Sequence, residues 1–119
     1  MSKLAITISD ISEIPNTKMI SFDGDFDGYS KENIDEIQKI IDECTPNSAL
    51  IFEFSKLNYL NSFAIGQIIN WHQIANTKNS DIYIVGTNKN VEDIFSVLGI
   101  KNILKIFPDI EALKADLSD

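Results

Sequence analysis

A single serine is the first candidate for chemistry in this sequence. Ser62 lies where an apolar, strand-like run gives way to a helical pattern. A helix N-terminus presents backbone N–H groups and a partial positive charge, so it can hold a phosphate group. Phosphorylation of Ser62 would add about −1.5 to −2 charges at this point. The simpler interpretation places Ser62 at the N-cap, where its hydroxyl accepts a hydrogen bond from the first turn.

A short acidic segment is the second candidate. Asp23, Asp25 and Asp27 match the first, third and fifth positions of a calcium loop, and Gly28 matches the sixth. The twelfth position of such a loop should be glutamate, but here it is Ile34, which a predicted helix needs for its apolar face. An ion-binding or small-ligand module therefore remains one alternative. The others are a solvated turn and an acidic loop that contacts a partner through Asp25 and Asp27.

One histidine and one cysteine complete the set of reactive side chains. His72 follows Trp71 on the inward side of a predicted helix, and Cys44 continues the apolar face of another. Both positions are typical of packed core residues. One histidine and one cysteine do not supply a usual zinc site, and the sequence has no glycine-rich phosphate loop. We therefore expect no metal site, no cofactor and no enzyme activity.

The hydrophobic patterning predicts an α/β fold that could position these residues. Strands are expected over residues 4–8, 18–22, 49–54, 81–85 and 103–107, with loops over 23–29 and 55–61. Helices are expected over residues 30–44, 62–76 and 91–98, the last capped by Gly99, and from Pro108 onward with Ile110, Leu113 and Leu117 inward. The order ββαβαβαβα indicates a mixed sheet with parallel central strands and about four covering helices.

Composition limits the classes of partner. The 119 residues are expected to form one domain, over residues 1–119. The net charge of −8 argues against nucleic acid and anionic membrane surfaces, which both attract clustered cations. All ten basic residues are lysines, so a phosphate site would have to use lysine or backbone N–H groups. The single cysteine and an N-terminus without signal-peptide features favour a cytoplasmic, bacterial-type setting.

The segment from Leu57 to Thr77 carries no charged side chain. Polar residues interrupt it, so it does not read as a membrane span. Phe63 and Ile74 fall outside the apolar stripe of the predicted helix, among uncharged hydrogen-bonding side chains. Interface cores have this composition. The simpler alternative is that the Phe63 side chain folds back onto a neighbouring loop. The predicted partner-binding residues of this segment are Asn58, Asn61, Phe63, Gln67, Asn70, Gln73 and Ile74.

The same segment carries a family resemblance. The run Ala-Leu-Ile-Phe-Glu-Phe at residues 49–54, followed by Leu-Asn-Ser-Phe-Ala-Ile-Gly at residues 60–66, resembles the central motif of the STAS domain family of anti-sigma factor antagonists. In that family a strand and a short loop precede Asp-Ser-Ser/Thr-Gly-Leu-Gly. The element order fits, and residues 97–107 and 111–113 resemble the family's last third. Ser62 matches the phosphorylated serine, whereas Asn61, Phe63 and Ala64 depart from the pattern.

The resemblance implies a small cytosolic regulator of transcription. Such a protein binds an anti-sigma factor or related serine kinase of histidine-kinase-like fold, which phosphorylates it, and a PPM-type phosphatase removes the phosphate. Carried over to this sequence, Ser62 is the phosphorylation site. The departures at Asn61, Phe63 and Ala64 leave a second interpretation open, a non-phosphorylated STAS scaffold in a larger assembly. The small-ligand or ion-binding module on Asp23, Asp25 and Asp27 is the third.

Overall fold

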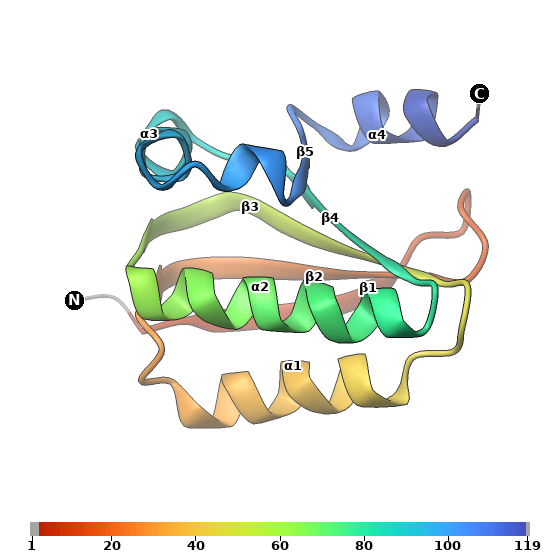
Figure 1. Cartoon of the computed structure of the whole chain (residues 1–119), viewed down its shortest axis with the longest axis horizontal. Coiled ribbons are helices and arrows are strands. Elements are labelled where there is room, and N and C mark those ends of the chain that lie inside the picture. Colours follow the sequence, from red (N-terminus) through yellow and green to blue (C-terminus); the bar gives the residue numbers. More distant parts are fainter. Residues whose placement is uncertain (1–2, 119) are drawn as a thin grey trace.

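The strands follow one another across the sheet in the same order as along the chain. In the computed structural model, which describes residues 3–118, β1 pairs with β2 antiparallel, and β2 to β5 pair parallel (Figure 1). This confirms the predicted mixed sheet with parallel central strands. The strands are β1 (Ala5–Asp10), β2 (Thr17–Phe26), β3 (Ala49–Leu60), β4 (Asp81–Val85) and β5 (Lys105–Phe107).

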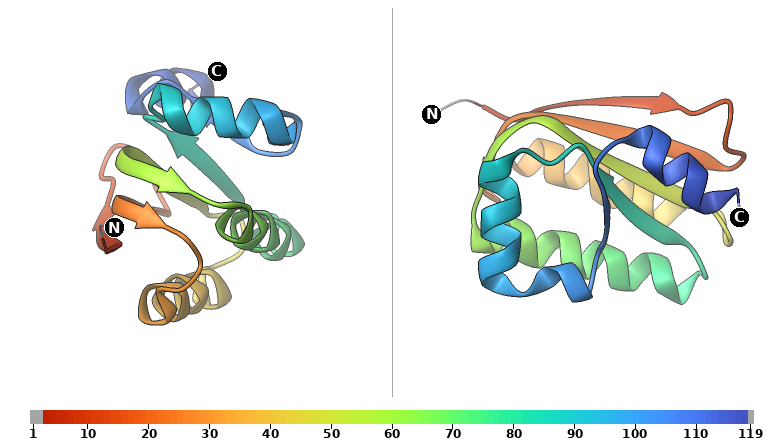
Figure 2. Two further views of the ribbon diagram at one scale, coloured as in Figure 1. Left: turned by 90° about the vertical axis from the view of Figure 1, so that its left-hand side faces the viewer. Right: turned by 90° about the horizontal axis from the view of Figure 1, so that it is seen from above.

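The helices alternate with the parallel strands, as the order ββαβαβαβα predicted. They are α1 (Lys31–Glu43), α2 (Ser62–Thr77), α3 (Lys89–Leu98) and α4 (Ile110–Leu117), with a short 3-10 turn η1 (Ile100–Asn102). Helices α1 and α2 lie side by side on one face of the sheet, and α4 lies on the opposite side (Figures 1 and 2). Within residues 3–118, each helix is too short or too polar to cross a bilayer.

Strands β2 and β3 are longer than the sequence predicted. The expected loops over residues 23–29 and 55–61 were wrong, because β2 continues through Phe26 and β3 through Leu60. Two register shifts, after Ser21 and after Gly24, each place one extra residue in β3. These bulges break the local alternation of apolar residues along β3, although Leu57 and Leu60 still point into the core. The extension carries both strands toward the N-terminus of α2.

The main core between the sheet and α1 and α2 is rich in aromatic side chains. The ring of Phe22 contacts Phe52 and Phe54 at centroid distances of 5.2 and 5.0 Å. Trp71 of α2 is fully buried, with its ring 6.0 Å from Phe52. Its indole N–H donates to Oε1 of Gln38 in α1 at 2.7 Å, which satisfies the buried donor. These contacts fix α2, and with it Ser62, against the sheet.

A second, smaller core lies under α4 on the other face. Ile51, Tyr83 and Val85 pack there against Leu113, which is fully buried. Asp109 caps α4 by accepting a hydrogen bond from the backbone N–H of Ala112 at 2.8 Å. Residues Ile110, Leu113 and Leu117 were all predicted to point inward, but Leu117 is 38% exposed because it lies in the last turn, beyond the edge of this core. Gly99 ends α3 with a φ of 68°, as predicted.

Candidate functional site

The carboxyl ends of β2 and β3 meet the N-terminus of α2 at one end of the molecule, on the left in Figure 1. The backbone N–H of Asn61 donates to the carbonyl of Phe26 at 3.3 Å, which joins the ends of the two strands. Residues 27–30 leave β2 at this point and lead into α1. Ligands of open α/β sheets bind at the carboxyl ends of parallel strands. The residues around Asn61 therefore form the natural candidate site.

Asn61, and not Ser62, is the N-cap of α2. The Asn61 side chain accepts a hydrogen bond from the backbone N–H of Ala64 at 3.0 Å, while its carbonyl accepts from Ile65 at 3.1 Å. The prediction that the Ser62 hydroxyl caps the helix was wrong, because β3 runs to Leu60 and leaves one extended residue before the first turn. Ser62 is the first helical residue and is exposed, and its hydroxyl has no hydrogen-bond partner within residues 3–118.

Phe63 packs on the loop between β2 and α1 and still exposes most of its surface. Its ring lies against Gly28 and stacks on Tyr29 at a centroid distance of 6.5 Å and an interplanar angle of 9°. Phe63 is 57% exposed and Tyr29 is 85% exposed. Phe63 is thus folded back onto a loop, as one sequence interpretation had it, and is also exposed, as the interface interpretation had it. Tyr29 was missed by sequence reasoning, because nothing in the pattern of a polar loop marks one of its residues as a contact.

The other predicted contact residues fall into two groups. Asn58, Asn70 and Gln73 are exposed, whereas Gln67, Asp25 and Asp27 are half-buried. Ile74 was predicted to lie off the apolar stripe, but it is half-buried and packs against the main core. Its placement off the apolar stripe was therefore wrong, and its role in partner binding stays a prediction. We call the exposed or half-exposed set around Ser62 the docking face; its members are Tyr29, Asn58, Ser62, Phe63, Gln67, Asn70 and Gln73.

Two asparagines at the N-terminus of α3, the N-cap Asn88 and Asn90 in the first turn, hydrogen-bond to the end of β3 beside the docking face. Asn88 donates its side-chain N–H to the carbonyl of Leu57 at 2.7 Å, and Asn90 donates to the carbonyl of Asn58 at 3.1 Å. Asn88 also caps α3 by accepting from the backbone N–H of Val91. These bonds link positions more than thirty residues apart in the chain, so the sequence alone gave no signal for them. They hold the last residues of β3 in place beside Ser62.

A family model described as the STAS domain matches residues 9–113. The chain belongs to the STAS domain family. A search of curated proteins found no match. In this STAS domain Ser62 is the first residue of α2, with the neutral Asn61 before it and the aromatic Phe63 after it.

Solved structures share the fold at low sequence identity. An anti-sigma factor antagonist from Mycobacterium paratuberculosis has a TM-score of 0.79 and 15% identity, over 95% of this chain and 93% of its own. A putative anti-sigma factor antagonist from Thermotoga maritima has a TM-score of 0.76 and 18% identity, over 96% and 95%. The Bacillus cell fate determinant SpoIIAA in its phosphorylated form has a TM-score of 0.67 and 14% identity, over 93% and 98%. At these identities the likeness shows the fold alone.

The calcium-loop interpretation does not fit the geometry of this STAS domain. Asp23 and Asp25 lie within β2, where extended backbone replaces the coiled loop that would wrap an ion, and only Asp27 lies beyond the strand. Within residues 3–118, no three histidine, cysteine, aspartate or glutamate side chains converge as metal ligands do. The basis for an ion module on these three aspartates is therefore removed, while Asp27 stays close to the docking face.

His72 and Cys44 are less buried than the sequence predicted. Both are half-buried, His72 on the flank of α2 and Cys44 at the C-terminus of α1. His72 Nε2 lies 3.0 Å from the side-chain nitrogen of Asn76, and His72 Nδ1 is buried without a partner among the described residues. Burial lowers the pKa of His72 below its ordinary value, an effect that Lys105 reinforces and Asp81 opposes. No nucleophile pairs with His72 in residues 3–118, so its environment gives no catalytic arrangement.

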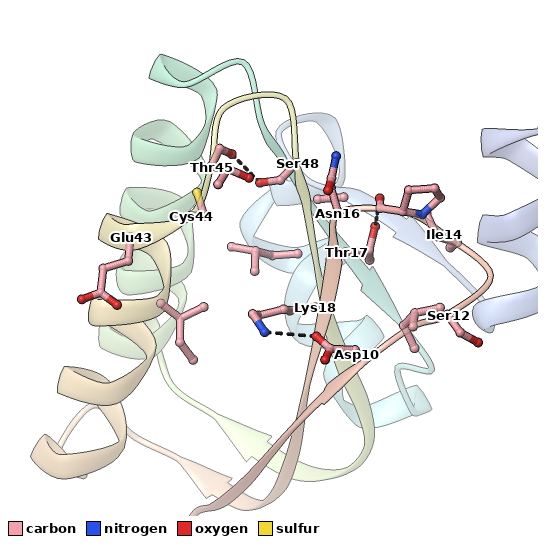
Figure 3. Close-up of a pocket in the computed structure, with 15 residues that line it drawn as sticks. Asp10, Ser12, Ile14, Asn16, Thr17, Lys18, Glu43, Cys44, Thr45 and Ser48 are labelled. Carbon is pink, nitrogen blue, oxygen red and sulfur yellow. Dashed lines mark hydrogen bonds and ion pairs between the residues drawn. The ribbon is translucent and has the colours of Figure 1, made fainter.

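A cavity of about 510 Å³ lies at the amino ends of β2 and β3, opposite the docking face. Figure 3 shows it between the β1–β2 hairpin and the C-terminal end of α1. Lys18 forms an ion pair with Asp10 at 3.0 Å, and Ser48 donates to the carbonyl of Thr45 at 2.7 Å. These polar groups of the wall are thus already bonded to one another. The cavity has mostly apolar lining and no convergent set of unpaired polar groups among the described residues.

Proposed function

We propose that this STAS domain is a regulatory protein-binding module of the anti-sigma factor antagonist kind. Its partner is an anti-sigma factor or serine kinase of histidine-kinase-like fold, and the contact surface is the docking face. The observation that carries the proposal is the exposed pair of Ser62 and Phe63 at the start of α2, in a segment without charge from Leu57 to Thr77. The module acts by binding and has no catalytic role of its own.

The composition of the docking face supports protein binding. Its aromatic members, Tyr29 and Phe63, are largely exposed, and its other members are uncharged hydrogen-bonding side chains. Interface cores are enriched in aromatic residues and depleted of charged ones, because charges lose their water on binding. Phe63 is also held in place by Gly28 and Tyr29, so binding requires little ordering of this anchor.

Phosphorylation of Ser62 is the proposed switch. The kinase transfers the γ-phosphoryl group of ATP to the Ser62 oxygen, which loses its proton, and ADP leaves; a PPM-type phosphatase hydrolyses the resulting ester. Ser62 is exposed, and the backbone N–H groups of Ser62 and Phe63 are not used within the helix. The N-terminus of α2 can therefore hold the phosphate. The added charge, on a face without other charges, weakens binding because it must be desolvated.

A second function is favoured by the residues that flank the serine. Asn61 carries no negative charge where the family motif has aspartate. Phe63 places a large apolar ring directly after Ser62, where the motif has serine or threonine. Both differences remove features that surround the acceptor serine in the family. On this reading the domain is a non-phosphorylated scaffold that uses the same docking face within a larger assembly.

A binding titration tests the first function. The titrant is the proposed partner, an anti-sigma factor or serine kinase of histidine-kinase-like fold, and the variants are Ser62→Asp and Ser62→Ala. We expect Ser62→Ala to bind as wild type does and Ser62→Asp to bind about tenfold more weakly. Ser12→Asp is the matched control, because Ser12 is exposed at the opposite end of the fold. Equal binding by all variants would remove the switch.

Intact mass measurement separates the switch from the scaffold. The wild-type protein is incubated with ATP and the same kinase, and Ser62→Ala is treated in parallel. One added phosphate on wild type and none on Ser62→Ala supports the switch. No added phosphate on either, together with tight binding, supports the scaffold.

A further inference from the structure

Two stacked aromatic rings are exposed at the edge of the docking face. The rings of Tyr29 and Phe63 are nearly parallel, with an interplanar angle of 9°. Tyr29 is 85% exposed and Phe63 is 57% exposed. Exposed aromatic surface is unfavourable in water. Single exposed apolar residues are common, but a contiguous pair of exposed rings indicates a binding site. We call this pair the Tyr29–Phe63 shelf.

The backbone on both sides of the shelf is fixed by hydrogen bonds. The Asp27 carboxylate accepts from the backbone N–H of Tyr29 at 2.9 Å, and the Tyr29 carbonyl accepts from Lys31 at 2.9 Å. On the other side, the side chain of Asn61 caps the turn that carries Phe63. The two rings are therefore presented from anchored backbone, and a ligand that stacks on them has little to reorder.

The segment that carries Tyr29 is predominantly acidic. The segment over residues 23–36, which includes Tyr29, holds one lysine against six carboxylates, those of Asp23, Asp25, Asp27, Glu32, Asp35 and Glu36. The lysine, Lys31, is already paired with Asp35 at 2.9 Å. The segment on the Phe63 side has no charge at all. Lys56 pairs in register with Asp23, but the Asp27 carboxylate is bonded to the Tyr29 backbone itself, so the Tyr29 side of the rings favours a cation over an anion.

The geometry points to an arginine side chain of the protein partner as the occupant of the Tyr29–Phe63 shelf. A guanidinium group is planar, stacks on aromatic faces and is weakly hydrated, whereas the lysine ammonium is compact and strongly hydrated. The inference rests on the proposed function, because it names a chemical feature of the partner that binds the docking face. Ser62 and Phe63 are adjacent in α2 and point in different directions, so a phosphate on Ser62 acts on another part of the partner.

An NMR titration of the full chain tests the shelf without the partner. The probes are three capped tripeptides, Gly-Arg-Gly, Gly-Lys-Gly and Gly-citrulline-Gly; citrulline keeps the planar shape of arginine without its charge. We expect the arginine peptide to shift the ring resonances of Tyr29 and Phe63, with about two- to fivefold weaker binding of the other two peptides. The shifts should shrink at high salt, because four of the six carboxylates in residues 23–36, those of Asp23, Glu32, Asp35 and Glu36, are exposed.

Two variants complete the titration. Tyr29→Ala should remove the arginine-dependent shift at Phe63, and the fold should persist because Tyr29 is exposed. Val97→Ala is the matched control, since Val97 is 84% exposed and lies on α3. Equal shifts with the arginine and citrulline peptides, or an unchanged response of Tyr29→Ala, would overturn the inference.

The outcomes separate the shelf from the proposed function. If Ser62→Asp weakens binding of the kinase but the rings ignore the arginine peptide, the shelf is wrong and the proposed function stands. If the rings respond to the arginine peptide but no Ser62 variant changes partner binding, the shelf stands and the switch is wrong.

Discussion

The ring of Phe63 lies directly on the backbone of Gly28. A Cβ atom built at residue 28 would come within 1.9 Å of Cδ1 of Phe63, and the φ of Gly28 is +86°, a conformation that side chains rarely adopt. The loop at Gly28 and the N-terminus of α2 are thus in van der Waals contact. The contact requires glycine, because any other residue would place a Cβ atom where the Phe63 ring lies. The shape of the docking face depends on this glycine as much as on the aromatic ring above it.

Replacement of Gly28 by alanine should destabilise the protein. Both the backbone strain and the collision with Phe63 act in the same direction, so we expect a loss of about 1–3 kcal/mol in the free energy of unfolding. Gly66→Ala is the matched control, because Gly66 lies in α2 with open space around it, and this variant should gain up to about 1 kcal/mol. Urea unfolding followed by fluorescence of Trp71 measures both. A neutral Gly28→Ala would show that the loop moves away from Phe63 freely.

Variants of Asn61 should separate capping from charge. Asn61→Ala removes the hydrogen bond to the Ala64 N–H and should cost about 1 kcal/mol. Asn61→Asp keeps the acceptor and adds a negative charge at the N-terminus of α2, so it should be about 0.3–1 kcal/mol more stable than wild type. Thermal unfolding at low and high salt measures the difference. Equal destabilisation by both variants would show that the Asn61 side chain does not cap α2.

The buried bond between Trp71 and Gln38 should contribute to stability through the indole N–H. Gln38→Met keeps the length of the side chain but leaves this buried donor without a partner, which should cost about 1–3 kcal/mol. Gln73→Met, on the exposed side of α2, should change stability by less than about 0.5 kcal/mol. Chemical unfolding compares the two. A similar, small effect of both substitutions would mean that water replaces Gln38 at the indole.

The pH dependence of stability should contain a contribution from His72. Its pKa in the folded protein is lowered from 6.5, chiefly by burial, so the unfolded chain binds the proton more tightly. The contribution to stability is therefore complete above pH 6.5 and is lost as the pH falls through the pKa of the folded state. The advantage of wild type over His72→Gln should decrease from about pH 8 to about pH 5. NMR titration of this single histidine gives its pKa, and a value at or above 6.5 would contradict the prediction.

The fold could be predicted from the sequence because apolar residues recur with helical or strand spacing in most elements, and because residues such as Gly99 mark helix ends. Gly99, for example, ends α3 in the left-handed conformation that the pattern predicted. The ends of β2 and β3 were not accessible, because Leu60 belongs to a strand only through bulged pairing with Phe26, a residue far away in the chain. This same extension decides that Asn61 and not Ser62 caps α2, although both residue types are common caps.

The candidate site was predicted in part for a related reason. The outward residues of α2, such as Asn70 and Gln73, follow from helical geometry and are exposed as predicted. Ile74 was misplaced because a helix in contact with both the sheet and α1 buries a wider arc than one apolar stripe. Tyr29 joins the site only through its stack on Phe63, and contacts between a loop and a distant helix leave no periodic trace in a sequence.

The strand order β1-β2-β3-β4-β5 has a consequence for synthesis of the protein. Each strand pairs with its neighbour along the chain, so none has to be inserted between two strands that already pair. The sheet can grow from one side, in the order in which the ribosome delivers its strands. Every member of the docking face lies between Tyr29 and Gln73. A nascent chain that has emerged only as far as the end of α2 already carries every residue of the docking face, and Asn88 and Asn90, which hold the end of β3 beside it, follow with α3.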